Sequence, residues 1–207
     1  MGSILSSIEY GLGRLLYNFK AHDDKLFTKG PAFTSFSEPT FEVDSPDCGA
    51  SNSTMKLEYT QLSKDHFPEL VWSTPSPGVR EYLLVVEDAD APLPFTPTHG
   101  LYYSIPATKT TINNNDVRAV DGAGKDKTLK GGFRLGKNIR GTVYSGPRPV
   151  MGHGAHRYYY QLIALKEPVD VENMSAMATK KELSEEIVGK VAGWGVWIGI
   201  FERKAKN

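Results

Sequence analysis

The chain has 207 residues, 40% of them hydrophobic, which is enough to build one domain around a single core. It contains 24 basic and 24 acidic residues, so no net charge attracts it to nucleic acid, and we expect no nucleic-acid partner. Its one cysteine, Cys48, excludes an intramolecular disulfide; because no cleavable signal or 20-residue apolar run is visible either, we expect a reducing, cytoplasmic location.

Residues 1–30 are predicted to form an amphipathic helical extension, because apolar side chains recur every three or four positions between residues 3 and 20. The stripe consists of Ile4, Ile8, Leu12, Leu15 and Phe19. The pattern favours a helix that packs on the domain or mediates self-association, and peripheral contact with a membrane is the alternative. Residues 1–6 also fit the N-myristoylation template at Gly2, although a cloning remnant followed by a native serine fits the template as well.

Residues 31–207 are expected to form a single domain that is mainly β. Short strands are predicted over residues 40–43 and 67–72, and the alternation of Met55, Leu57 and Tyr59 predicts a half-buried strand between them. A turn over residues 75–78 leads into a buried central strand that begins at Tyr82. Residues 107–140 are polar, with no apolar period in segments 113–116 and 122–124, and are expected to form a long surface loop.

Polar side chains gather where three predicted strands begin or end. The apolar run 82–86 stops abruptly at carboxylates, among them Asp88 and Asp90, and His99 stands at the entrance of another strand. A loop rich in glycine and proline over residues 146–154 then leads into the apolar strand 158–165. Because side chains alternate along a strand, His156 and Tyr158 should share one face while Arg157 points to the other.

The C-terminal part is predicted to contain one helix and one strand. Thr179 and Glu182 form a capping-box pattern, which predicts a helix over residues 180–190. A closing strand is expected over residues 193–203, whose glycines permit close backbone approach. Many short strands with late helices indicate a β-sandwich decorated by peripheral helices, without repeats or a second domain.

Five motifs in order resemble those of the phosphatidylethanolamine-binding protein family, also called Raf kinase inhibitor-like proteins, and in particular its bacterial and fungal branch. The D-P-D-A-P motif reads here as residues 88–92, the histidine before the next strand as His99, and the G-x-H-R motif as residues 154–157. A P-x-L-x-W element reads as residues 68–72, and a Gly-Pro pair as residues 146–147. The resemblance covers about residues 40–203 and implies a Greek-key β-sandwich with peripheral helices.

The resemblance also implies a small surface pocket that takes anions such as phosphate, phosphoryl headgroups or carboxylates. Its ligand-binding residues would be Asp88, Asp90, Pro92, His99, Gly146, His156 and Tyr158. Imidazole and phenol groups and the amides of the glycine-rich loop would converge on one oxyanion, with the carboxylates orienting the histidines. Since a bound anion raises imidazole pKa, affinity is expected to grow on mild acidification. By analogy with relatives, a protein client such as a kinase or protease is a further candidate partner.

Three features depart from the family pattern, and a fourth, the peptide bond before Pro92, is expected to follow it. Ala89 replaces a proline, which removes a fixed φ and is expected to loosen the acidic turn. Gly100 stands where the family has a bulky aromatic residue, which would widen the pocket. The Ala91–Pro92 bond is a cis candidate by resemblance, and His153 adds a titratable group to the loop. Together these changes allow a ligand larger than phosphate.

Structural alternatives exist for each site residue. Asp88 and Asp90 could cap turn amides, and Arg157 is interpreted as a structural residue that bonds a carboxylate. Tyr158 and its two tyrosine neighbours are strand formers in the first place. His153 and His156 have a metal-like spacing, but without a supporting helix or cysteine no metal site is expected. No cofactor fingerprint is present, and the sequence does not indicate the oligomeric state.

Two functions remain open, and binding is favoured over catalysis. The first is an anion or phospholipid-headgroup binder that modulates a kinase or protease. The second is a cofactor-independent enzyme, because fungal relatives work with polyketide pathways, some of them on maleic-anhydride-type units. Its catalytic residues would be Asp88, His99, His153, His156 and Tyr158, with a histidine as acid and base, Asp88 orienting it and Tyr158 stabilising an enolate.

Overall fold

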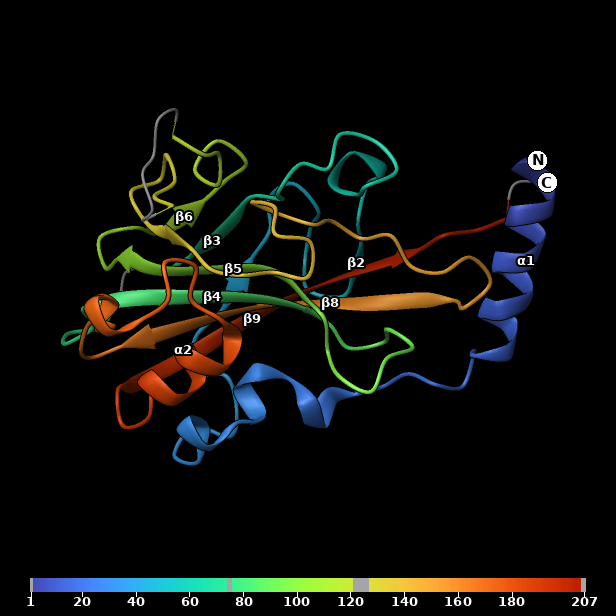
Figure 1. Ribbon diagram of the computed structural model, residues 1–207. Coiled ribbons are helices and arrows are strands. Elements are labelled where there is room, and N and C mark those ends of the chain that lie inside the picture. The colour runs from blue at the N-terminus through green and yellow to red at the C-terminus, as the bar shows by residue number, and fades with distance from the viewer. Residues whose placement is uncertain (1, 74–75, 121–126, 206–207) are drawn as a thin grey trace.

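The computed structural model describes residues 2–73, 76–120 and 127–205, with side chains from Ile4 onward. The fold is mainly β with two helices, as the sequence predicts (Figure 1). The expectations that concern Met1, the turn residue Pro75 and segment 122–124 lie outside the described residues. The division into an extension over residues 1–30 and a domain over residues 31–207 stays a prediction.

The strands of the described residues form two sheets. The larger has six strands in the order β2-β9-β8-β4-β5-β7, and the smaller has three in the order β1-β3-β6. The larger sheet comprises β2 (Ser53–Thr54), β9 (Val191–Glu202), β8 (Ala155–Leu165), β4 (Glu81–Asp88), β5 (Thr98–Pro106) and β7 (Arg134–Leu135). The smaller comprises β1 (Val43–Asp44), β3 (Leu70–Trp72) and β6 (Thr111–Ile112). The strand predicted from Tyr82 is therefore central, since β4 pairs with both β5 and β8.

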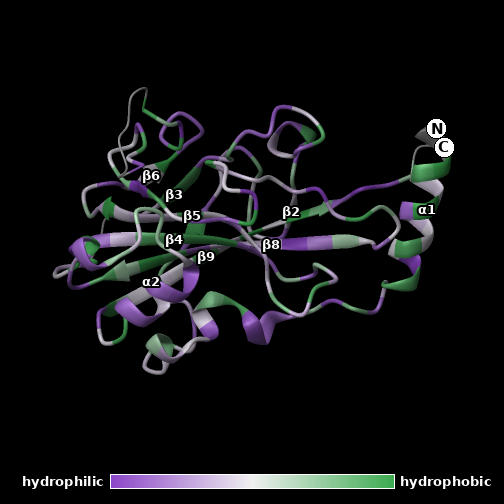
Figure 2. Cartoon of the chain, in the orientation of Figure 1, coloured by the Kyte–Doolittle hydropathy of each residue, from purple (hydrophilic) through white to green (hydrophobic). Residues whose placement is uncertain are grey.

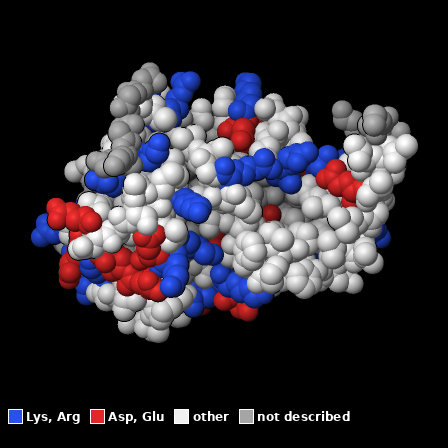
Figure 3. Space-filling view, viewed as in Figure 1, with Lys and Arg blue, Asp and Glu red and all other residues white. Residues whose placement is uncertain are grey.

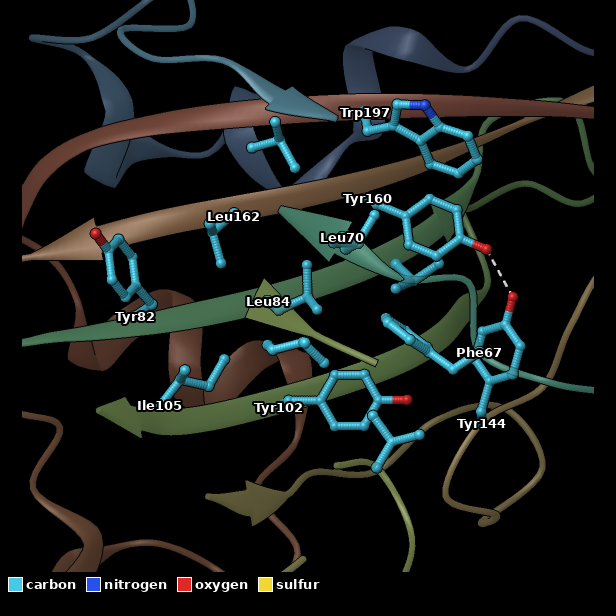
Figure 4. Close-up of a cluster of buried hydrophobic side chains, with 14 of the residues drawn as sticks. Phe67, Leu70, Tyr82, Leu84, Tyr102, Ile105, Tyr144, Tyr160, Leu162 and Trp197 are labelled. Carbon is cyan, nitrogen blue, oxygen red and sulfur yellow. Dashed lines mark hydrogen bonds between the residues drawn. The ribbon is translucent and has the colours of Figure 1, made fainter. Parts of the chain in front are cut away.

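A hydrophobic core lies between the two sheets. The small sheet contributes residues such as Leu70, and the large sheet contributes Leu84, Tyr102 and Trp197 (Figure 4). Phe67 packs edge-on against three tyrosine rings at centroid distances of 5.2 to 5.9 Å. This aromatic density explains how many short strands hold together, because each buried ring removes a large apolar area from water.

A second hydrophobic cluster covers the other face of the large sheet. It takes Phe27 and Phe33 from the short 3₁₀-helices after α1, and Leu183 from α2 (Lys180–Glu186). The predicted capping box at Thr179 and Glu182 is present. The helix ends earlier than the predicted residue 190, because the chain turns through Gly189 at a φ of +79° to enter β9.

Two sequence expectations about the β regions are wrong. Residues 57–59 form a 3₁₀-helix rather than a strand, so Leu57 is 55% exposed while Met55 and Tyr59 are buried. Residues 107–140 are more than a surface loop, since they supply β6 and β7 and bury side chains such as Phe133. Their few apolar residues are spaced irregularly, which is why no period was visible.

Helix α1 (Gly2–Leu15) stands at one edge of the molecule, beside the loop that precedes β8 (Figure 1). Its apolar stripe does not pack on the domain: Ile4, Ile8, Leu12, Leu15 and Phe19 are between 46% and 80% exposed. Figure 2 shows hydrophobic segments along the outlying helix α1. The helix contacts the domain through Glu9 and Gly13 instead, so the expected packing of the stripe is wrong. Self-association and membrane contact stay predictions. None of the described helices is long and apolar enough to cross a bilayer.

Two glycines of α1 make a matched test of this docking. A Cβ at Gly13 would lie 2.2 Å from the Met151 carbonyl oxygen, whereas one at Gly11 would meet no atom within 4 Å. Alanine favours a helix over glycine by about 1 kcal/mol at either position, so Gly11→Ala should stabilise the protein. Gly13→Ala should instead destabilise it by about 1–3 kcal/mol through overpacking and speed tryptic cleavage after Arg14. Equal behaviour of the two variants in urea unfolding and proteolysis would contradict the docking.

Candidate functional site

The topology brings three distant segments to one end of the large sheet. Because β4 runs antiparallel to both neighbours, its last residue lies beside the first residues of β5 and β8. Asp88 pairs directly with Tyr158, so their side chains share a face. His99 falls at an irregularity in the β4–β5 register, between the pairs Val86–Gly100 and Glu87–Thr98. A bulge of this kind re-aims a side chain, here toward the end of the sheet.

These side chains border a cavity of about 240 Å³. Its lining includes Asp88, Pro92, His99, His156 and Tyr158, together with Gln61, Arg140, Ser145, Arg148 and several apolar residues. Arg140 and Arg148 are exposed at its rim, and neither forms an ion pair with a described residue. Figure 3 shows a band of basic side chains running toward α1 beside a hollow in this face of the molecule. The charge around the opening is therefore positive.

Asp88, His156 and His153 form a buried hydrogen-bonded chain. His156 Nδ1 lies 2.8 Å from Asp88 Oδ2, and its Nε2 lies 2.7 Å from His153 Nδ1. His153 Nε2 lies 2.8 Å from the Leu16 carbonyl oxygen, which can only accept. Each of the three contacts needs one proton, so the carboxyl and two imidazoles together hold three protons and no net charge.

His153 is the inner end of this chain, and it is fully buried. Burial lowers its pKa, and the neighbouring His156 lowers it further. His156 lies between His153 and the carboxylate of Asp88. Both nitrogens of His156 are engaged within the protein, so this ring orients and neutralises rather than offering a free nitrogen to a ligand.

His99 has one engaged and one available nitrogen. Its Nδ1 lies 2.5 Å from the Ser145 carbonyl oxygen, which requires the proton on Nδ1. The neutral ring then carries a lone pair on Nε2, an atom that makes no hydrogen bond to any described residue. Burial lowers the pKa of His99, and this effect outweighs the raising influence of Asp88. At neutral pH His99 thus presents a base at the cavity.

Tyr158 contributes a phenol that lies beside Asp88 but makes no well-formed hydrogen bond to a described residue. Its ring is 1% exposed, and its hydroxyl is one of four buried side-chain polar atoms without a hydrogen bond among the described residues. Burial raises the pKa of Tyr158 well above its usual value, and the charge of Asp88 adds to this effect. The hydroxyl is therefore a neutral donor, and leaving it unpaired costs about 1–3 kcal/mol that a bound oxygen atom would recover.

Comparison with known proteins agrees with this geometry. The sequence model of the family described as "Phosphatidylethanolamine-binding protein" matches residues 45–202. The chain belongs to this family. It is 43% identical to phomoidride biosynthesis cluster protein B of Talaromyces stipitatus, over 99% of this chain and 84% of that protein. It is 41% identical to the protein of the same name from a fungal species, over 98% and 97% of the two chains.

The phosphatidylethanolamine-binding protein fold is also found by structural comparison. The crystal structure of E. coli YbcL, described as a member of the mammalian family, aligns with a TM-score of 0.66 at 22% identity. The alignment covers 79% of the present chain and 99% of the YbcL chain. The mainly β arrangement and the family resemblance expected from the five motifs are thus confirmed, while the Greek-key connection of the strands stays a prediction.

Two candidate ligand residues lie outside the cavity. Asp90 points to the other face of the sheet, where its carboxylate accepts from the backbone N–H, Nε and Nη2 of Arg157 at 2.9 Å. Arg157 also binds Asp23 through Nη1 and Nη2 at 2.8 Å, a contact that ties down the segment after α1. Gly146 does not offer its amide to a ligand, because this N–H donates to Asp65 Oδ1 at 2.8 Å.

The departures from the family pattern act differently from our expectations. A Cβ at Gly100 would lie 2.8 Å from the Tyr102 ring, so Tyr102 fills the space and Gly100 does not widen the cavity. Ala89 does not loosen the acidic turn, since its N–H, which a proline would lack, donates to the Arg157 carbonyl oxygen. The Ala91–Pro92 bond is trans rather than cis, in a turn that Leu93 N–H closes onto the Ala91 carbonyl.

The sequence reasoning missed the two arginines and Gln61 at the rim. Arg148 lies inside the glycine- and proline-rich loop, so an exposed cation next to the G-x-H-R motif was a usable signal. Gln61 and Arg140 come from regions without any motif, and only the folded chain shows them. Among the described residues no group of three possible metal ligands is found. His153 Nδ1 and His156 Nε2 lie within hydrogen-bond distance of each other, so neither nitrogen is directed at a shared metal position.

Proposed function

We propose that the protein binds a small oxyanion, a carboxylate or a phosphoryl group, in the cavity bordered by His99, His156 and Tyr158. The observation that carries this proposal is the Tyr158 hydroxyl, which is buried, neutral and unpaired at the cavity. An anion oxygen would satisfy it. Membership of the phosphatidylethanolamine-binding protein family supports this ligand class.

Electrostatics favour the same conclusion. The chain of Asp88, His156 and His153 is neutral as a unit, so the Asp88 carboxylate does not repel an anion by its full charge. Arg140 and Arg148 then supply the positive potential at the mouth. A kinase or protease client, as the family resemblance implies, would contact this same rim.

The Tyr158→Phe variant tests the anion site with the least disturbance, because it removes only the unpaired oxygen. Phosphate or acetate titrated into the wild-type protein should shift the ring signals of His99 and His156 in NMR spectra. We expect the variant to keep its fold and bind about tenfold more weakly, the effect of one charge-assisted hydrogen bond. Tyr159→Phe is the control, since that hydroxyl binds Asp23 on the other face. Unchanged affinity in Tyr158→Phe would remove the site.

A second function, proton-transfer catalysis, is favoured by the state of His99. A neutral imidazole with a free Nε2 and a neutral phenol border one cavity, which is the pair needed to remove a proton beside a carbonyl and to stabilise the resulting enolate oxygen. The relatives with 43% and 41% identity are named for phomoidride biosynthesis clusters. The substrate would be a dicarboxylate or anhydride unit of a fungal polyketide, and the reaction a coupling or cyclisation without a cofactor.

A further inference from the structure

A second cavity, a groove, lies on the other side of the loop 148–153 from the anion cavity. It measures about 790 Å³ and is lined by Ser6, Ser7, Tyr10, Leu57, Leu62, Met151, Arg203, Lys204 and Ala205. This groove shares no lining residue with the anion cavity, which takes residues 148–150 from the same loop. Its volume is in the range of small-molecule sites, about 300–1,000 Å³.

The lining of the groove is mixed, and its large apolar side chains come from separate segments. Tyr10, Leu57 and Leu62 are large hydrophobic residues that are 43%, 55% and 38% exposed, and Met151 is buried behind them. Single exposed apolar residues are ordinary, but three that converge on one concavity form a site for apolar chains.

One wall of the groove is held in place by α1. Glu9 accepts from the side chain of Arg203 and from Met151 N–H, and the Leu16 carbonyl oxygen bonds His153. The Gly13 backbone approaches Met151 so closely that a Cβ would clash. The groove is therefore part of the fold rather than a gap beside a loose helix. The family match begins at residue 45, whereas the fungal relatives span 99% and 98% of the chain and so include α1.

The charge at the groove is positive. Arg203 is neutralised by Glu9, but Lys204 is exposed and forms no ion pair with a described residue. A ligand that satisfies both features carries an aliphatic chain for the walls and an anionic head for Lys204. We propose that this groove binds an anionic amphiphile, an aliphatic carboxylate of medium chain length. The proposal is independent of the anion cavity.

The test titrates the full-length protein with decanoate below its micelle concentration, by calorimetry, beside octanoate and acetate. Each methylene buried in the groove should strengthen binding by about two- to fourfold. Decanoate should therefore bind saturably and about tenfold more tightly than octanoate, and acetate should show no binding that depends on the groove. Decyl phosphate tests whether the head must be a carboxylate, and equal affinity would widen the ligand class to anionic amphiphiles in general.

Matched variants separate the groove from other sites. Leu62→Asp and Lys204→Glu should each weaken decanoate binding at least tenfold. Leu5→Asp, which places the same charge on the outward face of α1, should not, since Leu5 is 69% exposed and does not line the groove. His99→Gln should keep decanoate binding, and Leu62→Asp should keep phosphate binding.

Three outcomes would overturn the proposal. The first is decanoate binding that does not saturate, and the second is equal weakening by Leu5→Asp and Leu62→Asp, which would indicate adhesion to α1. The third is a doubled mass in equilibrium sedimentation that Leu62→Asp reverses, because a second copy of the chain would then fill the groove.

Discussion

Replacing Arg157 by methionine is expected to lower the free energy of unfolding by about 3 kcal/mol, the usual cost of breaking a buried ion pair. The guanidinium is the only cation paired with Asp90 among the described residues, and the Asp90 side chain is only 5% exposed. Burial by itself would raise the pKa of Asp90, but the hydrogen bonds and charge of Arg157 outweigh burial and hold it below its usual value. Without the guanidinium, the buried carboxylate keeps only backbone partners, the N–H groups of residues 21 and 157, and has no cation to balance its charge.

The pH dependence of the stability of Arg157→Met shows whether the lost stability comes from the Asp90 carboxylate. In the wild type the lowered pKa of Asp90 contributes stability above its unfolded-state pKa, and this is lost as the pH falls through the folded-state pKa. In Arg157→Met the effect of burial on the pKa of Asp90 dominates, so acidification protonates this carboxylate and removes its buried charge. The difference in free energy of unfolding between the wild type and the variant should therefore become smaller as the pH falls. Urea unfolding at several pH values measures this, with the exposed Arg80→Met as control.

A double variant provides the stricter control for the same pair. Asp90→Asn removes the charge that Arg157 serves, so adding it to Arg157→Met should recover part of the lost stability. Full additivity of the two single effects would mean that the ion pair is energetically unimportant. Because Arg157 also binds Asp23, we attribute the stability that the double variant does not recover to the loss of that second contact.

Most of the fold could be predicted from the sequence because its main elements have long and regular hydrophobic patterns. The apolar runs of β4 and β8, together with the capping box of α2, predicted elements that the structure contains. The failures fall where tertiary contacts decide. Residues 57–59 alternate like a strand but close a 3₁₀ turn, and α1 has the expected stripe but docks by Gly13, where backbones meet most closely. The spacing of apolar residues along a helix does not by itself show which face of the helix packs against the rest of the protein.

The candidate site could be predicted where it depends on the alternation of side chains along a strand. Alternation along β8 placed His156 and Tyr158 on one face, and Arg157 on the other. The family resemblance implied that Asp90 lines the cavity, but the chain leaves β4 after residue 88 and Asp90 binds Arg157 instead. The contact of His153 with Leu16 joins positions 137 residues apart, which no local pattern shows.

Changing His99 to glutamine is expected to reduce turnover by about 100-fold or more if the protein is a proton-transfer catalyst, because a glutamine side chain cannot accept the proton that the imidazole takes. His66→Gln is the control, since that histidine lies outside the cavity lining. Thermal unfolding checks that both variants remain folded. Activity would be followed on a dicarboxylate or anhydride polyketide unit, and equal rates in the two variants would exclude His99 as the base.

The two functions also predict opposite responses to pH, and His99 is the reason. Burial lowers the pKa of His99, so the ring is neutral at neutral pH and gains a proton on Nε2 only as the solution is acidified. That proton adds a donor, so anion affinity should rise as the pH falls. The same proton removes the base, so turnover should fall over the same range. In His99→Gln both dependences should flatten. Affinity that grows while turnover declines assigns both effects to one imidazole, whereas turnover that increases on acidification would show that His99 does not act as a base.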